Sequence, residues 1–143
     1  MNHLEATKTD ARVSASVATN ATHSHEIDTY GYEYASIDVV FGAYSAATSQ
    51  YATVLKLQQS DTAGSGQTDI AAYTVTAGAG ATTPATKGAV CRYNVDLRGK
   101  KRYLTVVTTP GNAVPVVTVA RLGKGNEAPY NAATAGVNNY VSG

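Results

Sequence analysis

The sequence has few of the residues that usually carry disulfides, metal centres and membrane segments. Its 143 residues include one cysteine, Cys91, so neither an intrachain disulfide nor a zinc site built from several cysteines can form. Charged residues make up 15% and the formal net charge is +1, which leaves no broad electrostatic surface for nucleic acid or an anionic membrane. No stretch approaches the roughly 20 apolar residues of a membrane span, and the N-terminal segment lacks the apolar run of a signal peptide. We therefore expect a protein made in a cytoplasm, with no nucleic-acid partner and no membrane partner.

What the sequence does contain is the alternation typical of β-strands. Apolar and polar residues alternate with a period of two over much of the chain, whereas helical periodicity is nearly absent. The strand candidates, in chain order, are residues 11–19, a short piece near Tyr32, 36–41, 51–58, 70–76, 91–97, 102–107 and 114–122. Seven or eight short strands at intervals of roughly 10 residues are typical of an antiparallel β-sandwich, a jelly roll or a barrel.

The connections between these candidates carry turn residues. Residues 98–101 separate two strand candidates, and Gly99 can take the positive φ of a tight turn, so we expect a β-hairpin there. Residues 60–66 form a polar turn cluster, and residues 76–88 form a long loop rich in glycine, alanine and threonine.

Length and patterning divide the chain into one domain and two arms. We expect residues 13–122 to fold as an antiparallel β-sandwich or jelly roll, with an extended N-terminal arm over residues 1–12 and an extended C-terminal arm over residues 123–143. Neither arm has enough apolar residues to bury a core face, so each is either disordered or becomes ordered on a partner. The C-terminal residues that could dock into shallow grooves of a partner are Pro129, Tyr130, Val137, Tyr140 and Val141.

Few residues suggest chemistry. His23 and His25 could place two imidazoles on one strand face as a metal pair. However, two imidazoles without a third, firmly placed ligand bind metal weakly, and we favour an exposed loop or strand end. Cys91 lies on the apolar face of its strand candidate, which favours a buried core cysteine over a nucleophile. Asp38 should point to solvent, where nothing raises its pKa as a glycosidase acid would need. We therefore assign no catalytic residue, cofactor or metal ligand, and we expect no enzymatic activity.

The remaining candidates concern contact with other proteins. Arg98, Lys100, Lys101 and Arg102 gather basic charge at the expected hairpin tip, which is either a solvated turn or a contact for an acidic patch on a partner. Tyrosines at every second position from Tyr30 to Tyr34 should share one strand face, where they either cap the core or serve an interface. An aromatic platform for a sugar is a further alternative, although such platforms favour tryptophan, which is absent. The candidate protein interface consists of the five C-terminal residues above together with Arg98, Lys100 and Lys101.

Three segments together resemble a known family. They are YEYASIDVVFGA at residues 32–43, LKLQQSD at 55–61 and GKKRYLTVV at 99–107. In that order they are similar to segments of the capsid cement, or decoration, proteins of short-tailed phages. The resemblance covers about residues 28–122. It departs from the family pattern at Gln59, where an acidic residue is common, and in a long insertion from Thr76 to Gly88.

The resemblance implies a jelly-roll virion protein on the outer surface of the capsid. Such a protein would bind an assembled icosahedral head built from an HK97-type major capsid protein. Homo-oligomers, most often dimers, would bridge neighbouring capsomers, and the family brings no catalytic residues. Two other interpretations stay open at this point: another virion module, such as a head fibre base or a tail adaptor, and a carbohydrate-binding β-sandwich.

Overall fold

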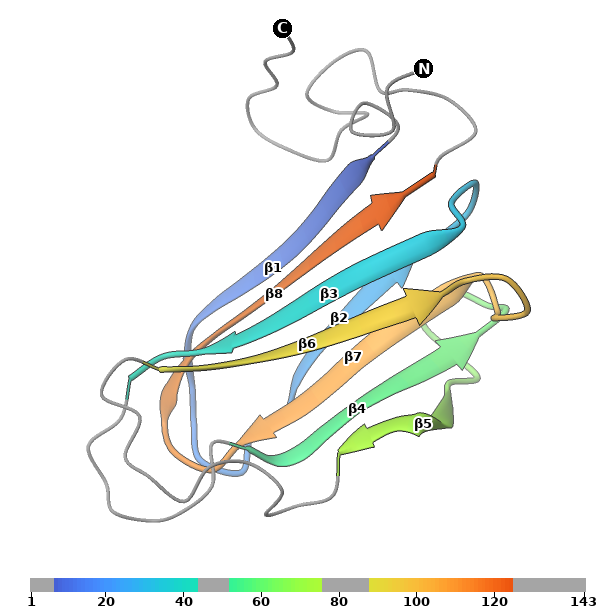
Figure 1. The fold of residues 1–143 in the computed structure, drawn as a ribbon. Coiled ribbons are helices and arrows are strands. Elements are labelled where there is room, and N and C mark those ends of the chain that lie inside the picture. Colours follow the sequence, from blue (N-terminus) through green and yellow to red (C-terminus); the bar gives the residue numbers. More distant parts are fainter. Residues whose placement is uncertain (1–6, 44–51, 76–87, 125–143) are drawn as a thin grey trace, which may run out of the picture.

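The computed structural model describes residues 7–43, 52–75 and 88–124, and these residues form an all-β sandwich. The strands are β1 (Lys8–Val17), β2 (His23–Asp28), β3 (Tyr34–Phe41), β4 (Ala52–Ser60), β5 (Thr68–Val75), β6 (Ala89–Asp96), β7 (Tyr103–Pro110) and β8 (Val114–Gly123). Two antiparallel four-stranded sheets, β1-β8-β3-β6 and β2-β7-β4-β5, face each other (Figure 1). The predicted fold class is confirmed. The described segments contain no helix that could cross a membrane.

The strands pair in the nested order of a jelly roll. β1 pairs with β8, β2 with β7, β3 with β6, and β4 with β5. The chain is thus arranged as one long antiparallel ribbon folded over itself, and the β3–β8 and β4–β7 pairs complete the two sheets. Eight strands in two such sheets define a jelly roll.

The core lies between the two sheets and follows from the alternation in the sequence. Ile37, Val39 and Phe41 of β3 point inward and are buried, as are Leu57 of β4 and Leu104 of β7 in the facing sheet. Burying each such side chain contributes roughly 1.5–3 kcal/mol. The inward positions are therefore occupied by groups that hold the scaffold, and contact with partners falls to the outer faces and the loops.

The sandwich begins earlier than the expected boundary at residue 13. β1 starts at Lys8, and Lys8 to Arg12 pair with β8 from Leu122 back to Thr118. The sequence predicts this strand only from residue 11, because its first inward positions include the polar residues Asp10 and Arg12 rather than aliphatic ones. Residues 1–6 and residues 125–143, which include most of the expected C-terminal arm, lie outside the described residues.

The expected hairpin at residues 98–101 is wrong. β6 pairs with β3, whereas β7 pairs with β2 and β4, so residues 97–102 cross from one sheet to the other. Gly99 does take a positive φ of 78°. Leu97, however, is buried in the core and its backbone N–H donates to the carbonyl of Glu33 at 2.8 Å, which directs the chain across the sandwich.

One strand was not expected, and one strand candidate is a turn. β2 covers His23–Asp28, whereas the piece near Tyr32 belongs to the connection between β2 and β3. There the backbone N–H of Tyr32 donates to the carbonyl of Thr29 at 3.1 Å. Tyr30 is exposed in this turn, so Tyr30, Tyr32 and Tyr34 do not share one strand face as predicted.

Both ends of the sandwich domain lie at the same end of the molecule. β1 begins and β8 ends as neighbours, with Lys8 opposite Leu122 (Figure 1). The connections at residues 29–33, 61–67 and 97–102 lie at this end as well. We call it the terminal end.

Candidate interaction surface

The predicted basic residues Arg98, Lys100 and Lys101 lie at the terminal end. Arg98 forms a fork with Asp96, with Nη2 2.6 Å from Oδ2 and Nε 2.9 Å from Oδ1. This hydrogen bonding lowers the pKa of Asp96 to about 2. Lys101 Nζ lies 3.4 Å from a carboxylate oxygen of Asp61. Within the described chain, Lys100 is thus the one of the three that forms no ion pair, although its charge also helps to lower the pKa of Asp96.

Arg102, the fourth basic residue of the predicted basic cluster, organises the next part of this surface. Its guanidinium meets both carboxylate oxygens of Asp28, at 2.9 and 2.8 Å, and this hydrogen bonding lowers the pKa of Asp28. The same guanidinium lies 4.9 Å from the ring centre of Tyr30 and 5.0 Å from that of Tyr103. Arginine stacked on tyrosine and paired with a carboxylate is typical of protein interfaces. The terminal end is therefore a charge-balanced, aromatic surface rather than a simple basic patch.

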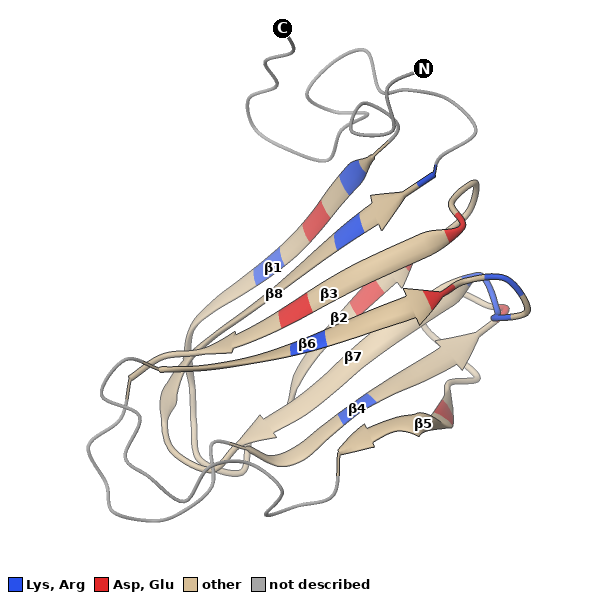
Figure 2. Cartoon of the chain, in the orientation of Figure 1, with Lys and Arg blue, Asp and Glu red and all other residues tan. Residues whose placement is uncertain are grey.

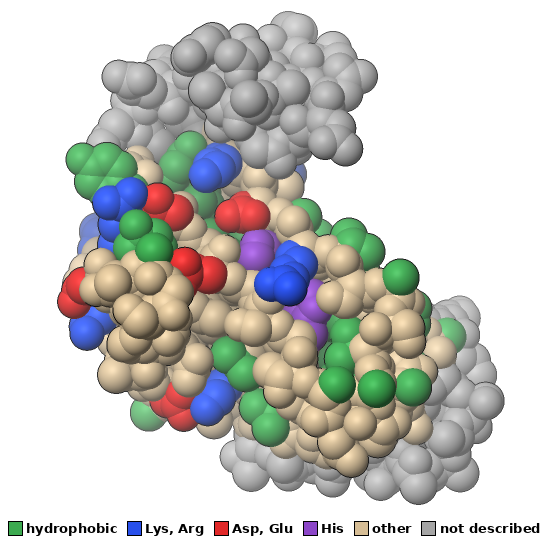
Figure 3. Space-filling view, turned by 180° about the vertical axis from the view of Figure 1, so that it is seen from behind, with side chains coloured by type: hydrophobic (Ala, Val, Ile, Leu, Met, Phe, Trp, Pro, Cys, Tyr) green, Lys and Arg blue, Asp and Glu red, His purple; other side chains and the backbone are tan. Residues whose placement is uncertain are grey.

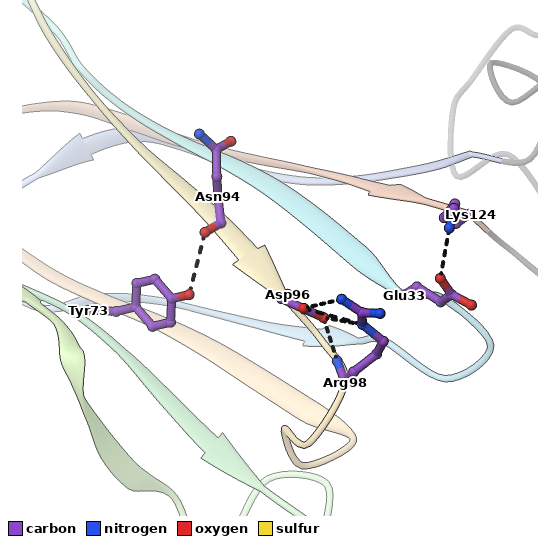
Figure 4. A network of polar contacts seen from close by, with 6 residues as sticks. All are labelled: Glu33, Tyr73, Asn94, Asp96, Arg98 and Lys124. Carbon is purple, nitrogen blue, oxygen red and sulfur yellow. Dashed lines mark hydrogen bonds and ion pairs between the residues drawn. The ribbon is translucent and has the colours of Figure 1, made fainter.

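A groove of about 610 Å³ opens beside it on the outer face of the β1-β8-β3-β6 sheet. Tyr34 and Arg121 are among the residues that line it. Two cations already form cation–π contacts with the Tyr34 ring, with Arg98 Cζ 5.4 Å and Lys124 Nζ 5.5 Å from its centre. Lys124 is held by Glu33 at 3.3 Å (Figure 4). Because cations occupy this ring, it does not offer the free aromatic face that a sugar platform needs.

Further along the same face, the outer surface of the sheet is apolar. The strand registers place Val13 opposite Val117, Val117 opposite Val40, and Val40 opposite Val90, one valine from each strand. Val13 is 69% exposed and Val90 66% exposed. Outward positions of a sandwich are normally polar. We call these four residues the valine row. The signal for it is visible in the sequence, because the doublets Val39-Val40 and Val116-Val117 put an apolar residue on each face of a strand.

The two histidines lie in β2 with both rings turned inward, which corrects the expectation of an exposed loop or strand end. Both are buried between the edges of the two sheets. His25 Nε2 lies 2.9 Å from Asp10 Oδ1, and His25 Nδ1 lies 2.6 Å from the Thr118 hydroxyl. His23 Nε2 lies 3.3 Å from the same hydroxyl, and His23 Nδ1 lies 2.9 Å from that of Ser14. Figure 3 shows the two rings (purple) close to acidic and basic groups at the surface.

The donors and acceptors of this histidine network can be assigned in order. A carboxylate only accepts, so His25 donates from Nε2 to Asp10 and, as a neutral ring, accepts at Nδ1 from the Thr118 hydroxyl. That hydroxyl then accepts from His23 Nε2, and neutral His23 accepts at Nδ1 from Ser14. Every member of the network has a partner, as buried polar groups require.

Thr118, His25 and Asp10 have the connectivity of a hydroxyl–imidazole–carboxylate triad, but their burial does not suit catalysis. The Thr118 side chain is fully buried, so a substrate cannot reach its oxygen. Burial also lowers the pKa of His23, assisted by the nearby charge of Arg12. In the described part of the chain, no group of three or more histidine, cysteine, aspartate or glutamate side chains could hold a metal ion.

Cys91 and Asp38 lie on opposite faces of the β1-β8-β3-β6 sheet, as the alternation predicts. Cys91 is half-buried beside the core, and burial raises the pKa of its thiol, which disfavours the thiolate. Asp38 points outward and forms a fork with Arg92, at 2.6 and 2.8 Å, which lowers the pKa of the carboxyl. A general acid would need the opposite shift.

The predicted interface residues of the C-terminal arm lie outside the described residues. They are Pro129, Tyr130, Val137, Tyr140 and Val141, and they stay predictions. What the structure adds is the origin of the arm: β8 ends at the terminal end, next to the start of β1.

Comparison with known proteins identifies no family. No family model matches the sequence, and no curated protein matches it. Among solved structures, the chain is similar to the PRD1 vertex protein P5, with a TM-score of 0.43 and 10% sequence identity over 82% of this chain and 95% of that chain. At this TM-score and identity, the likeness carries no argument about what the chain does.

Proposed function

We propose that this chain is a structural virion protein that binds the outside of an assembled icosahedral phage head and cements neighbouring major capsid protein subunits. What supports the proposal first is the resemblance of three segments to cement proteins. These segments lie in β3, in β4 with its following turn, and in β7 with the preceding connection. The fold that the resemblance implied, a jelly roll, is the fold of the described residues.

The observation that carries the proposal is the position of the chain ends. β1 begins and β8 ends side by side at the terminal end, among Arg98, Lys100 and Arg102. Any segment that continues from either strand therefore starts next to an aromatic, ion-paired surface. Together these elements can form one contact area of separate weak contacts, which add up when every copy meets a repeating lattice.

Binding to assembled shells tests this function. The purified full chain is mixed with empty heads of an HK97-type capsid protein from the phage that encodes it, and separately with unassembled capsid subunits. We expect co-sedimentation with heads, little binding to free subunits, and heads that resist heating better. Failure to sediment with heads would contradict the cement role, and the number of copies bound per head would separate it from a head fibre base or a tail adaptor.

A charge-reversal pair tests the surface itself. Lys100→Glu introduces a carboxylate at the terminal end, where Lys100 forms no ion pair with a described residue, and we expect weaker binding to heads. Lys56→Glu makes the same change on β4, where Lys56 pairs with Asp69 at 3.0 Å, and should bind as the unchanged protein does. Equal loss in both variants would show that net charge, rather than the terminal end, determines attachment.

A further inference from the structure

The valine row needs a partner surface, and its surroundings indicate which. On the side towards the terminal end it is extended by Ala11 and Val119, which pair with each other across β1 and β8. We use "level" for the outward-facing residues that lie side by side across the four strands. The level of Ala11 and Val119 also carries the Asp38–Arg92 fork on β3 and β6, so these two charges neutralise each other. In Figure 2 the charged positions of the β1-β8-β3-β6 sheet extend from the terminal end to the Asp38–Arg92 pair near the middle of the strands, and the part of the sheet beyond that pair carries none.

Arg121 is the exception in this balance of charges. It lies on β8 one level closer to the terminal end than Val119, is exposed, and has no carboxylate partner among the described residues. It faces the groove from the level that also holds Ser36 and Asn94, neither of which carries charge. An apolar row with a free cation two levels away fits a surface that offers apolar side chains and a carboxylate at the same spacing.

We propose that this surface is the same face of a second copy of the chain. The two sheets pack face to face about a two-fold axis that runs parallel to the strands, between β8 and β3. In this arrangement β8 of one copy lies over β3 of the other, and β1 lies over β6. Val117 then meets Val40 of the second copy, and Val13 meets Val90 of the second copy, so the valine row covers itself.

The same axis also provides a carboxylate for Arg121. Arg121 of one copy lies over Ser36 of the second copy, and Asp38 of the second copy is two residues further along β3. Two residues along a strand span about 7 Å, and packed sheets lie about 10 Å apart, so an extended arginine reaches that carboxylate. The symmetry gives two such pairs in each dimer, each next to the existing Asp38–Arg92 fork.

The alternative two-fold axis, along the valine row, fits less well. It also places valine over valine, but it turns Arg121 towards the β7–β8 turn of the second copy, residues 111–113. That turn contains glycine, asparagine and alanine and therefore no carboxylate. Charge complementarity selects the axis parallel to the strands.

The size of this face predicts a weak dimer. Four strands about 4.8 Å apart and three levels of residues about 7 Å apart cover roughly 400 Å² per copy, or about 800 Å² in total. Stable interfaces bury about 1,200–2,000 Å². We therefore expect a dimer that forms and dissociates with protein concentration. This inference does not depend on the proposed function, because two copies can associate through this face whatever else they bind.

Sedimentation of the full chain over a range of concentrations tests the face. We expect a monomer–dimer equilibrium that Val117→Asp and the edge variant Val90→Asp abolish. Val54→Asp, which changes a 37% exposed valine on β4 of the other sheet, should leave it intact. Arg121→Gln should raise the dimer Kd about tenfold, since each dimer loses two charge pairs. Circular dichroism of each variant confirms that it is folded.

Cross-linking distinguishes the two axes. In a Cys91→Ser background, a mixture of Val13→Cys and Val90→Cys proteins should be joined by a short bis-maleimide, whereas Val13→Cys alone should not. Efficient joining of Val13→Cys to itself would overturn the proposed axis. A chain that stays monomeric at every concentration, or a dimer that survives Val117→Asp and Val90→Asp, would overturn the proposed interface. Binding to heads is measured separately, so these outcomes leave the cement role to its own test.

Discussion

Replacing Thr118 by valine removes one hydroxyl from the centre of the histidine network and almost preserves the shape of the side chain. That hydroxyl lies 2.6 Å from Nδ1 of His25 and 3.3 Å from Nε2 of His23, in a fully buried position. Valine would leave an acceptor on one ring and a donor on the other without partners. A buried polar group that loses its partner costs about 1–3 kcal/mol. Because the 3.3 Å contact is long and contributes less, we expect the free energy of unfolding to fall by about 2–4 kcal/mol.

The matched control is Thr105→Val. Thr105 is 4% exposed in β7, and its hydroxyl has no hydrogen-bond partner among the residues that the structure describes. The substitution removes and adds the same atoms as Thr118→Val, but here it eliminates an unpaired polar atom instead of creating two. We expect the free energy of unfolding to stay unchanged or to rise by up to about 1 kcal/mol.

Urea unfolding followed by far-ultraviolet circular dichroism and tyrosine fluorescence measures both variants near pH 7.5. When the unfolding free energy of a variant depends on urea concentration with the same slope as in the unchanged protein, a difference in the midpoint urea concentration reports the difference in stability directly. At about 3–4 °C per kcal/mol for a chain of this size, the two variants should differ in Tm by roughly 6–20 °C. Equal stability losses for Thr118→Val and Thr105→Val would refute the reasoning, because the hydrogen bonds would then contribute nothing beyond the packing of the side chain.

Three further predictions concern pH, backbone and chain ends. The pKa of His23 lies below its ordinary value of 6.5, so the unfolded chain takes up the proton first. The free energy of unfolding should therefore fall as the pH drops below about 6.5, and pH titration of His23→Gln should give a flatter curve over that range. Gly88 and Gly64 both have positive φ, but a Cβ at Gly88 also meets the carbonyl oxygen of Phe41, whereas one at Gly64 meets nothing. Thermal unfolding should show Gly88→Ala less stable than Gly64→Ala by about 1–3 kcal/mol, and equal losses would contradict this account. Deletion of residues 125–143 spares Gly123, whose carbonyl accepts a hydrogen bond from Glu33, so the truncated chain should unfold at an unchanged temperature and lose binding to heads. Undiminished binding would show that the arm is not needed.

The fold class followed from the sequence because its strongest strands have one clearly apolar face. The alternation of Ile37, Val39 and Phe41 survives in the structure without change. β2 was not predicted because two of its three inward residues are histidines. The alternation of a strand can be recognised in the sequence only when the residues that it buries are apolar. The start of β1 was missed for the same reason, because its inward Asp10, Arg12 and Ser14 are polar and face that histidine network.

Pairing between strands was harder to predict than the strands themselves. Gly99 and the basic residues around it give a correct local signal for a turn, and the glycine has the expected positive φ. Whether such a turn returns the chain to its own sheet depends on where Leu97 is buried, which is decided by residues far away in sequence. The candidate surface was missed for a related reason. Val40 and Val117 become one row only when the register between β3 and β8 is known.

The nested pairing of the strands also determines the order in which the chain can acquire structure. Among the described strands, only β4 and β5 pair with an immediate neighbour in the chain; β1 must wait for β8, which is synthesised roughly a hundred residues later. Contacts between such distant segments slow folding, since a long loop has to close before any of them is formed. While the ribosome is still working, the apolar inward face of β3 has no permanent cover and is open to aggregation. If the finished chain leaves the ribosome quickly and stays dilute, it should therefore fold to the soluble protein more often than it aggregates into inclusion bodies.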